Sequence, residues 1–165
     1  MNYNDFKSRS DALNPKNSFC VIAPAGSGKT EILTQRMLRL LADVDNPENI
    51  IAITFTRKAA NEMIDRIVSN LTKAKNNLPP KKEHELITWN LSRNVLKRSE
   101  ERNWNLLVNS SRLRIQTIDS FCQTIVNDLP ILSRFGGNAS PTENADLLYN
   151  FAVENLFSEM QSLSS

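Results

Sequence analysis

The sequence predicts an α/β fold in which a parallel sheet is flanked by helices. Three short apolar runs indicate strands, at residues 18–23, 49–55 and 112–118, and a helical pattern follows each of them. Strands that alternate with helices pair in parallel and are joined by right-handed crossovers. The 165 residues correspond to about one domain, and 40% apolar with 23% charged content is ordinary for a globular protein.

The first strand–helix pair surrounds a glycine-rich loop. Residues 18–23 (SFCVIA) predict a buried strand that leads directly into this loop. Residues 29–42 then predict an amphipathic helix. The inward face of this helix is expected to hold Ile32, Leu33, Met37, Leu40 and Leu41.

A second pair follows the first. Residues 49–55 predict another buried strand, and residues 57–74 predict another amphipathic helix. The inward face of this second helix is expected to hold Ala60, Met63, Ile64, Ile67 and Leu71. A linker at 75–82 then breaks the helix with adjacent prolines.

The remaining pattern adds one strand and more helices. The predicted elements are a helix, a strand, a helix, a loop and a last helix, at residues 83–108, 112–118, 119–129, 130–142 and 143–160. Trp89 and Trp104 are expected to anchor the packing of the first of these. Three strands make a thin parallel sheet, because such sheets usually have more strands and two covered faces. We therefore expect the chain to be a piece of a larger structure.

Composition excludes several classes of protein. No apolar run approaches the roughly 18 residues of a membrane span, and the N-terminal stretch lacks an apolar core, so we expect no targeting peptide and a cytoplasmic protein. Cys20 and Cys122 agree with a reducing compartment, and we expect both to be buried. His84 has no Cys or His neighbour at ligand spacing, so it predicts no metal site.

The net charge of +2 hides a segregation along the chain. Residues 57–114 contain 13 Lys or Arg and six Asp or Glu. Residues 1–56 contain six of each sign, and residues 115–165 contain one Arg and six acids. A basic middle fits a polyanionic partner such as nucleic acid. It fits a solvated helical surface equally well, so both interpretations stay open.

The stretch APAGSGKT at residues 23–30 predicts a phosphate-binding loop. It matches the pattern G-x-x-x-x-G-K-[ST], except that Ala23 stands at the first glycine position, where a small residue is sufficient. The later glycines let backbone N–H groups turn toward phosphate oxygens at the positive end of a helix. The residues expected to bind the nucleotide are Ala25, Gly26, Ser27, Gly28, Lys29, Thr30 and Glu31.

Two residues of this loop are the expected catalytic groups. The ammonium of Lys29 can reach the β- and γ-phosphates, and the hydroxyl of Thr30 is suited to ligate Mg²⁺. A glycine turn with an incidental lysine is the structural alternative. The predicted order of strand, turn and helix favours the nucleotide site.

Hydroxyl and aromatic residues follow the second and third predicted strands. Ligands of open α/β sheets bind at the carboxyl ends of strands, where hydroxyls and helix-start N–H groups can contact phosphates. The ring of Phe55 could stack on a base, which is worth about 1–3 kcal/mol. The expected DNA-binding residues are Thr54, Phe55, Thr56, Arg57, Thr117 and Ser120.

The stretches APAGSGKTEILTQR, ITFTRKAANEM and IQTIDSFC resemble motifs I, Ia and Ib of UvrD/Rep-like superfamily 1 DNA helicases. The nearest branch is the RecB/AddA type, sometimes named exonuclease V beta-like. The resemblance implies a P-loop NTPase (RecA-like) sheet: residues 1–142 would be an incomplete first motor domain with a helical insertion at about 75–110. Residues 143–165 would begin an inserted helical subdomain.

The resemblance also implies a function. Motif I would bind ATP and Mg²⁺, whereas motifs Ia and Ib, the latter including Asp119, would contact single-stranded DNA. The chain would then be the ATP-binding portion of an ATP-dependent helicase, and a further partner would be a second helicase–nuclease subunit. Relatives often have Asn where Arg57 stands and His where Asp119 stands.

Several family features are missing from this sequence. It has no Asp-Glu dipeptide, which relatives use to hold Mg²⁺, and no upstream Gln that reads adenine. The arginine finger and second motor domain are also absent, so we expect an N-terminal fragment that binds MgATP without translocating. Two alternatives stay open: a small P-loop kinase or ATPase without a DNA role, and an inert remnant of a truncated gene.

Overall fold

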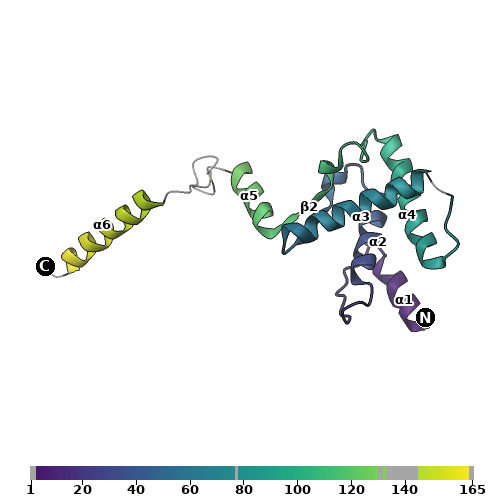
Figure 1. The fold of residues 1–165 in the computed structure, drawn as a ribbon, viewed down its shortest axis with the longest axis horizontal. Helices are drawn as coiled ribbons and strands as arrows, with labels where there is room; N and C mark the ends of the chain where they lie inside the picture. The colour runs from purple at the N-terminus through teal and green to yellow at the C-terminus, as the bar shows by residue number, and fades with distance from the viewer. Residues whose placement is uncertain (1–2, 77, 130–131, 133–144, 164–165) are drawn as a thin grey trace. The chain divides into compact units, whose positions relative to one another are not determined.

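The computed structural model describes residues 3–76, 78–129, 132 and 145–163 (Figure 1). The chain divides into two compact units, Met1–Cys122 and Gln123–Ser165. The elements of the first unit are α1 (Tyr3–Ala12), α2 (Lys29–Leu41), β1 (Ile51–Thr54), α3 (Arg57–Asn76), α4 (Glu83–Glu101) and β2 (Arg114–Thr117). Short 3₁₀ turns occupy Pro47–Asn49 and Ser110–Arg112. Helix α5 (Ile118–Asp128) follows β2, and α6 (Asp146–Leu163) belongs to the second unit.

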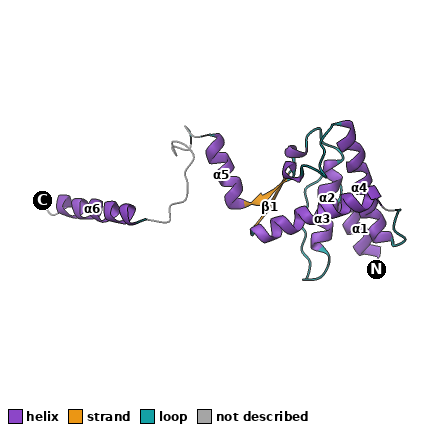
Figure 2. Cartoon of the chain, turned by 45° about the horizontal axis from the view of Figure 1, so that its top comes forward, coloured by secondary structure: helices purple, strands orange, loops and turns teal. Residues whose placement is uncertain are grey.

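The predicted parallel pairing is confirmed for β1 and β2. The two strands lie in register from Ile51 opposite Arg114 to Thr54 opposite Thr117. Helix α3 follows β1 directly and packs against both strands (Figure 2). The chain is therefore a mixed α/β structure with a small parallel sheet of two strands in its described part.

The strand predicted at residues 18–23 is wrong. This segment has no regular secondary structure, and Ile22 near its end is 93% exposed. An apolar strand stays extended and buried only when neighbouring strands and a covering layer accept it. In the described chain β1 and β2 pair with each other, and neither pairs with this segment.

Two burial predictions are wrong for related reasons. Ile51 and Ile53 on one face of β1 are exposed, because no described layer covers that face. Cys20 and Cys122 are both exposed free thiols. Cys20 lies in the uncovered segment before the loop, which accounts for its exposure.

The core lies where α4 packs against both α2 and α3. The central buried side chains are Leu38, Leu41, Ile67, Leu71, Val95, Trp104 and Leu106. Of the residues predicted to face inward on α3, Ala60, Ile67 and Leu71 are buried, and Met63 and Ile64 are half-buried. The helical periodicity of α3 therefore identified its core face correctly.

The buried face of α2 matches the prediction at Ile32, Met37 and Leu41 but differs at other positions. Leu33 is 51% exposed, and Leu38 is fully buried. Thr34 and Gln35 are also buried, because Thr34 Oγ1 donates to the carbonyl of Thr30 (2.8 Å) and Gln35 has a polar partner on α4. These hydrogen bonds offset the free-energy cost of burying the two polar side chains. Hydrophobic periodicity follows only apolar residues, so it did not predict their burial.

Helix α4 ends at Glu101, seven residues before the predicted end at 108. Asn103 and Asn105 both adopt φ +54°, a left-handed conformation that stops a helix. Trp104 between them is 2% exposed, and its indole Nε1 donates to the carbonyl of Asp45 (3.0 Å). Trp104 is thus confirmed as a packing anchor, whereas Trp89 is half-buried at the edge of the core.

A two-pronged ion pair joins the turn before β1 to the turn before β2. Arg112 Nε and Nη2 donate to Glu48 Oε1 and Oε2, at 2.6 and 3.1 Å. The hydrogen bonds from Arg112 lower the pKa of the Glu48 carboxyl below its usual 4.5. Bidentate geometry of this kind fixes both partners.

The second unit contains α6, which overlaps the helix predicted at 143–160. Its described apolar side chains are exposed: Leu147, Leu148, Tyr149, Phe151, Val153, Leu156, Phe157 and Met160. The loop predicted at 130–142 lies outside the described residues except at 132. Within the described part of the chain, no helix has the length and apolar character to cross a bilayer.

Candidate nucleotide and nucleic-acid site

The glycine-rich loop has the backbone shape that its two glycines permit. Gly26 and Gly28 adopt φ +76° and +86°, values that favour glycine because it has no Cβ. Gly28 also occupies the N-cap of α2. The loop therefore turns sharply and delivers the chain directly into the first turn of this helix.

Lys29 is folded back over the loop. Its Nζ donates to the carbonyls of Ala23 and Pro24, both at 2.6 Å. These hydrogen bonds close the loop around the ammonium group. Lys29 is thus placed inside the loop that precedes it in sequence, where the motif requires a cation.

The start of α2 leaves its backbone donors uncapped. Gly28 makes no side-chain capping bond, so the first-turn N–H groups at residues 29–31 have no capping side chain. Thr30 is exposed, and a Cβ added at Gly26 would meet nothing within 4 Å. Ser27 Oγ is buried without a hydrogen-bond partner among the described residues. The loop thus has open space, uncapped donors and an unsatisfied hydroxyl, which fit an anionic phosphate chain.

The side chain of Glu31 is committed to the neighbouring helices. Its Oε1 accepts hydrogen bonds from Thr88 Oγ1 (2.6 Å) and Gln35 Nε2 (3.2 Å), and Gln35 also donates to Thr88 (2.9 Å). Arg66 Nη1 of α3 lies 3.9 Å from its other oxygen. The backbone N–H of Glu31 is therefore the part of this residue that suits an anion.

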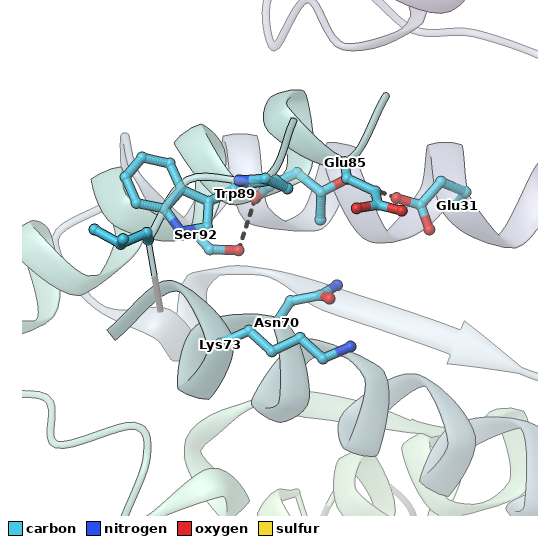
Figure 3. A pocket seen from close by; sticks show the side chains of 9 residues that line it. Glu31, Asn70, Lys73, Glu85, Trp89 and Ser92 are labelled. Carbon is cyan, nitrogen blue, oxygen red and sulfur yellow. Dashed lines mark hydrogen bonds between the residues drawn. The ribbon is translucent and has the colours of Figure 1, made fainter. Parts of the chain in front are cut away.

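A hollow of about 510 Å³ lies beside this network. Figure 3 shows Glu31, Glu85, Trp89 and Ser92 on one side of the hollow and Asn70 with Lys73 of α3 on the other. Two polar groups on the first side have protein partners, since Thr88 donates to Glu31 and Ser92 Oγ donates to the Thr88 carbonyl (2.8 Å), whereas Trp89 Nε1 is buried without a hydrogen-bond partner among the described residues. The hollow reaches the phosphate loop only through Glu31, so it is distinct from the loop.

Two arginines that sequence patterns did not single out organise the segment around the loop. Arg9 Nη2 of α1 donates to the carbonyl of Ser27 (2.7 Å). Arg36 donates to the carbonyls of Ala12, Asn14 and Asn17, at 2.6, 3.1 and 2.8 Å. Arg9 lies outside the quoted motifs, and Arg36 ends the motif I stretch without an assigned role, so the sequence alone offers no signal for these contacts.

The hydroxyl residues at the strand ends lie together at one end of the sheet. Thr54 and Thr117 are register partners. Thr54 Oγ1 donates to the carbonyl of Thr56 (3.0 Å), and Thr56 Oγ1 accepts the N–H of Ala59 (3.1 Å). Thr56 thereby caps α3, as a threonine at a helix start commonly does.

The end of β2 has similar local hydrogen bonds. Thr117 is 6% exposed, and its Oγ1 lies 2.9 Å from Ser120 Oγ and accepts the N–H of Ser120 (3.2 Å). Asp119 is exposed in the first turn of α5, where the helix dipole favours an acid. Phe55 is 91% exposed beside Arg57, which is also exposed at the start of α3. Of the expected DNA-binding residues, Thr54 is half-buried and Thr117 is buried, whereas the exposed ones are Phe55, Thr56, Arg57 and Ser120.

A family comparison decides the class of protein. The model of the UvrD/REP helicase N-terminal domain matches residues 5–162. The chain belongs to the UvrD/REP helicase family. The glycine-rich loop and both strand ends lie within the matched residues.

Curated relatives agree with this family. The chain is 31% identical over 149 residues to AddA, an ATP-dependent helicase/nuclease protein of Thermoanaerobacter sp. (strain X514), covering 87% of this chain and 10% of that protein. It is 36% identical over 96 residues to ATP-dependent DNA helicase PcrA of Bacillus subtilis (strain 168), covering 58% of this chain and 13% of PcrA. The chain therefore spans only about a tenth of the length of these relatives. No solved structure matches it significantly.

Just over half of the cations in the basic middle of the chain form ion pairs in its described part. In the described part of the chain, seven of its 13 cations form ion pairs with acids: Lys58, Arg66, Lys82, Lys97, Arg98, Arg102 and Arg112. Asp45, for example, accepts from both Arg98 (3.0 Å) and Arg102 (2.5 Å). Three of the paired acids, Glu31, Asp45 and Glu48, lie outside residues 57–114, so they offset part of the positive excess of this segment.

Proposed function

We propose that this chain is the ATP-binding portion of an ATP-dependent DNA helicase, with ATP and Mg²⁺ as its cofactors. The observation that carries the proposal is the loop at residues 23–30: two left-handed glycines, an inward lysine and an uncapped helix start, in a chain of the UvrD/REP family. Backbone donors and a lysine arranged in this way are what a polyphosphate needs.

Each loop residue has a role in this proposal. Backbone N–H groups from Ala25 to Glu31 hold phosphate oxygens, and the Lys29 ammonium balances their charge. Thr30 supplies a hydroxyl to Mg²⁺, which when bound supplies electrostatic stabilisation to the phosphates. Ser27 Oγ gains the hydrogen-bond partner that it otherwise lacks in the described chain.

The strand ends supply the second half of the proposal. We assign single-stranded DNA to the edge formed by Thr54, Phe55, Thr56, Arg57, Thr117 and Ser120. The exposure of Phe55 supports base stacking, and the start of α3 beside Arg57 supports a phosphate contact. The buried Thr117 contributes by shaping the turn into α5.

The wider organisation follows from the family. We assign residues 1–142 to a first motor domain of the P-loop, RecA-like type, with the insertion at about 75–110, and residues 143–165 to a helical subdomain. We assign ATP hydrolysis and translocation to a full-length protein, because this sequence has no Asp-Glu pair to activate water. A second helicase–nuclease subunit would be a partner of that full-length protein. We also propose a cytoplasmic location for the protein.

The test is a titration of the chain with a fluorescent ATP analogue and Mg²⁺, beside the variant Lys29→Ala. Saturable binding by the natural chain and its loss in Lys29→Ala support the nucleotide site. A parallel titration with a fluorescent single-stranded oligonucleotide at two salt concentrations should show binding that weakens with salt. Nucleotide binding without DNA affinity would favour a small ATPase, and the absence of both would refute the proposal.

A further inference from the structure

We propose that Arg9 is a positioning residue of the phosphate-binding loop, a role that rests on the proposed nucleotide site. Arg9 lies on α1, and its Nη2 reaches the Ser27 carbonyl at 2.7 Å although 18 residues separate the two. The arginine is half-buried rather than spread on the surface. Helix α1, which lies outside the glycine-rich motif, thus contacts the middle of the loop through Arg9.

The contact determines how one peptide of the loop faces. The Ser27 carbonyl and the Gly28 N–H belong to the same planar trans peptide, so they point in opposite directions. Because Arg9 holds the carbonyl on its own side, the Gly28 N–H is turned to the other side of the loop. Arg9 therefore orients a backbone donor of the kind that binds phosphate.

Gly28 and Arg9 fit each other sterically. A Cβ at residue 28 would lie 3.2 Å from Arg9 Nη1 and 3.8 Å from Nη2. No such neighbour exists at Gly26, where added atoms would meet open space. Glycine at 28 therefore serves two purposes, since it permits φ +86° and leaves room for the guanidinium.

The charge of Arg9 acts in the same direction. Its guanidinium lies against Gly28, the residue before Lys29, so two cations and the positive end of α2 converge on one turn. Such a concentration of positive charge favours a polyphosphate over a neutral ligand. Arg9 thus orients the loop and also attracts a polyphosphate through its charge.

The experiment measures affinity for the MgATP analogue and for inorganic tripolyphosphate, which lacks a base. Arg9→Met keeps the apolar stem but removes the donors and the charge, and we expect roughly tenfold weaker binding of both ligands. Arg9→Lys, which restores a charge and one donor, should lose less. Lys7→Gln removes a charge from the same helix at an exposed position and should bind as the natural chain does.

Two further readouts separate positioning from simple support of the fold. The melting midpoint of the ligand-free chain should be nearly the same for Arg9→Met and Lys7→Gln. The loss of affinity caused by Gly28→Ala should be smaller in the Arg9→Met background, because the clash at residue 28 is then relieved. Unchanged affinity in Arg9→Met would overturn the inference. A loss of affinity would also overturn it if the melting midpoint of the ligand-free Arg9→Met chain fell sharply at the same time.

The natural chain and Lys29→Ala are measured first. If the natural chain binds neither ligand, the proposed nucleotide site fails, and the role of Arg9 fails with it. If the natural chain binds, Lys29→Ala does not, and Arg9→Met binds normally, only the inference about Arg9 is refuted.

Discussion

Thr54 and Thr117 face each other as the last register pair of the parallel sheet, and a helix begins within three residues of each. The ends of the two proposed DNA-contact stretches, about 60 residues apart in sequence, are thereby brought side by side. Both hydroxyls are engaged in local hydrogen bonds. We therefore expect the exposed side chains near these strand ends, rather than the two threonine hydroxyls, to make most of the contacts with single-stranded DNA.

Phe55 provides the direct test of this expectation. Phe55→Ala should weaken single-stranded DNA binding by about 1–3 kcal/mol, the value of one base–aromatic stack. Because the ring is 91% exposed, the unfolding free energy should change by less than about 0.5 kcal/mol. Leu78→Ala, at a side chain 90% exposed, is the matched control in fluorescence anisotropy titrations. Equal DNA affinities of the two variants would remove Phe55 from the interface.

Thr88 should stabilise the chain through its hydroxyl. Thr88→Val keeps the shape but leaves Glu31 and the buried Gln35 short of a partner, so we expect a loss of about 1–3 kcal/mol in unfolding free energy. Urea denaturation measures it. The control is Thr72→Val, whose exposed hydroxyl donates to the Val68 carbonyl and should matter little. Similar losses for both variants would contradict a role for the Glu31 network.

The two loop glycines should differ in their tolerance of alanine. Replacing either should cost roughly 1–2 kcal/mol for a left-handed alanine, since both have positive φ. Gly28→Ala should cost more than Gly26→Ala, because its Cβ meets Arg9 at 3.2 Å while the other meets nothing. Chemical denaturation of the two variants compares them. A larger loss at Gly26 would contradict the contact with Arg9.

Ile67 tests the helical core. Ile67→Val removes one methylene from a fully buried side chain, and we expect a loss of about 0.5–1.5 kcal/mol. Ile22→Val makes the same chemical change at a side chain 93% exposed, so its effect should be close to zero. The unfolding free energies of the two variants should therefore separate clearly. If Ile22→Val were as damaging, residue 22 would be packed in solution.

The Glu48–Arg112 pair should make the fold acid-sensitive. The pKa of Glu48 is lower when folded than the usual 4.5, so its contribution is present above the unfolded pKa and is lost as pH falls through the folded value. The difference in unfolding free energy between the natural chain and Glu48→Gln should be constant from about pH 7 to 5 and shrink below about pH 4. Glu62→Gln, at an exposed carboxylate 4.0 Å from Lys58, is the control for loss of a surface ion pair and should change the unfolding free energy by less than about 1 kcal/mol at pH 7. A difference that grows on acidification would have the wrong sign.

Local patterns predicted α2, α3, α5, α6 and the parallel pair of strands, but they did not predict α1 and placed the end of α4 too late. The inward residues of α3 follow from periodicity, and the glycine turn follows from residue type, since both depend on neighbours a few residues away. The strand at residues 18–23 failed because strand formation depends on a partner elsewhere in the chain. Its apolar composition was compatible with a strand but could not supply that partner.

The contacts near the site that the sequence did not predict join residues that lie far apart in the chain. Gln35 is buried because of Thr88, 53 residues away, and Arg9 reaches Ser27 across 18 residues. Neither contact leaves a period or a motif in the sequence. The residues of the glycine turn, by contrast, are contiguous, so their type and spacing predicted the turn, and its binding of phosphate stays a prediction.

The hydrogen bonds from Lys29 to the carbonyls of Ala23 and Pro24 give the loop an internal competitor. A polyphosphate that recruits this ammonium must exchange one set of contacts for another. Its measured affinity would then report the difference between the two sets, and the more firmly the loop holds its own lysine, the weaker an otherwise identical ligand would bind. The occupancy of the proposed site would thereby be tuned by two backbone oxygens that no side-chain substitution can remove.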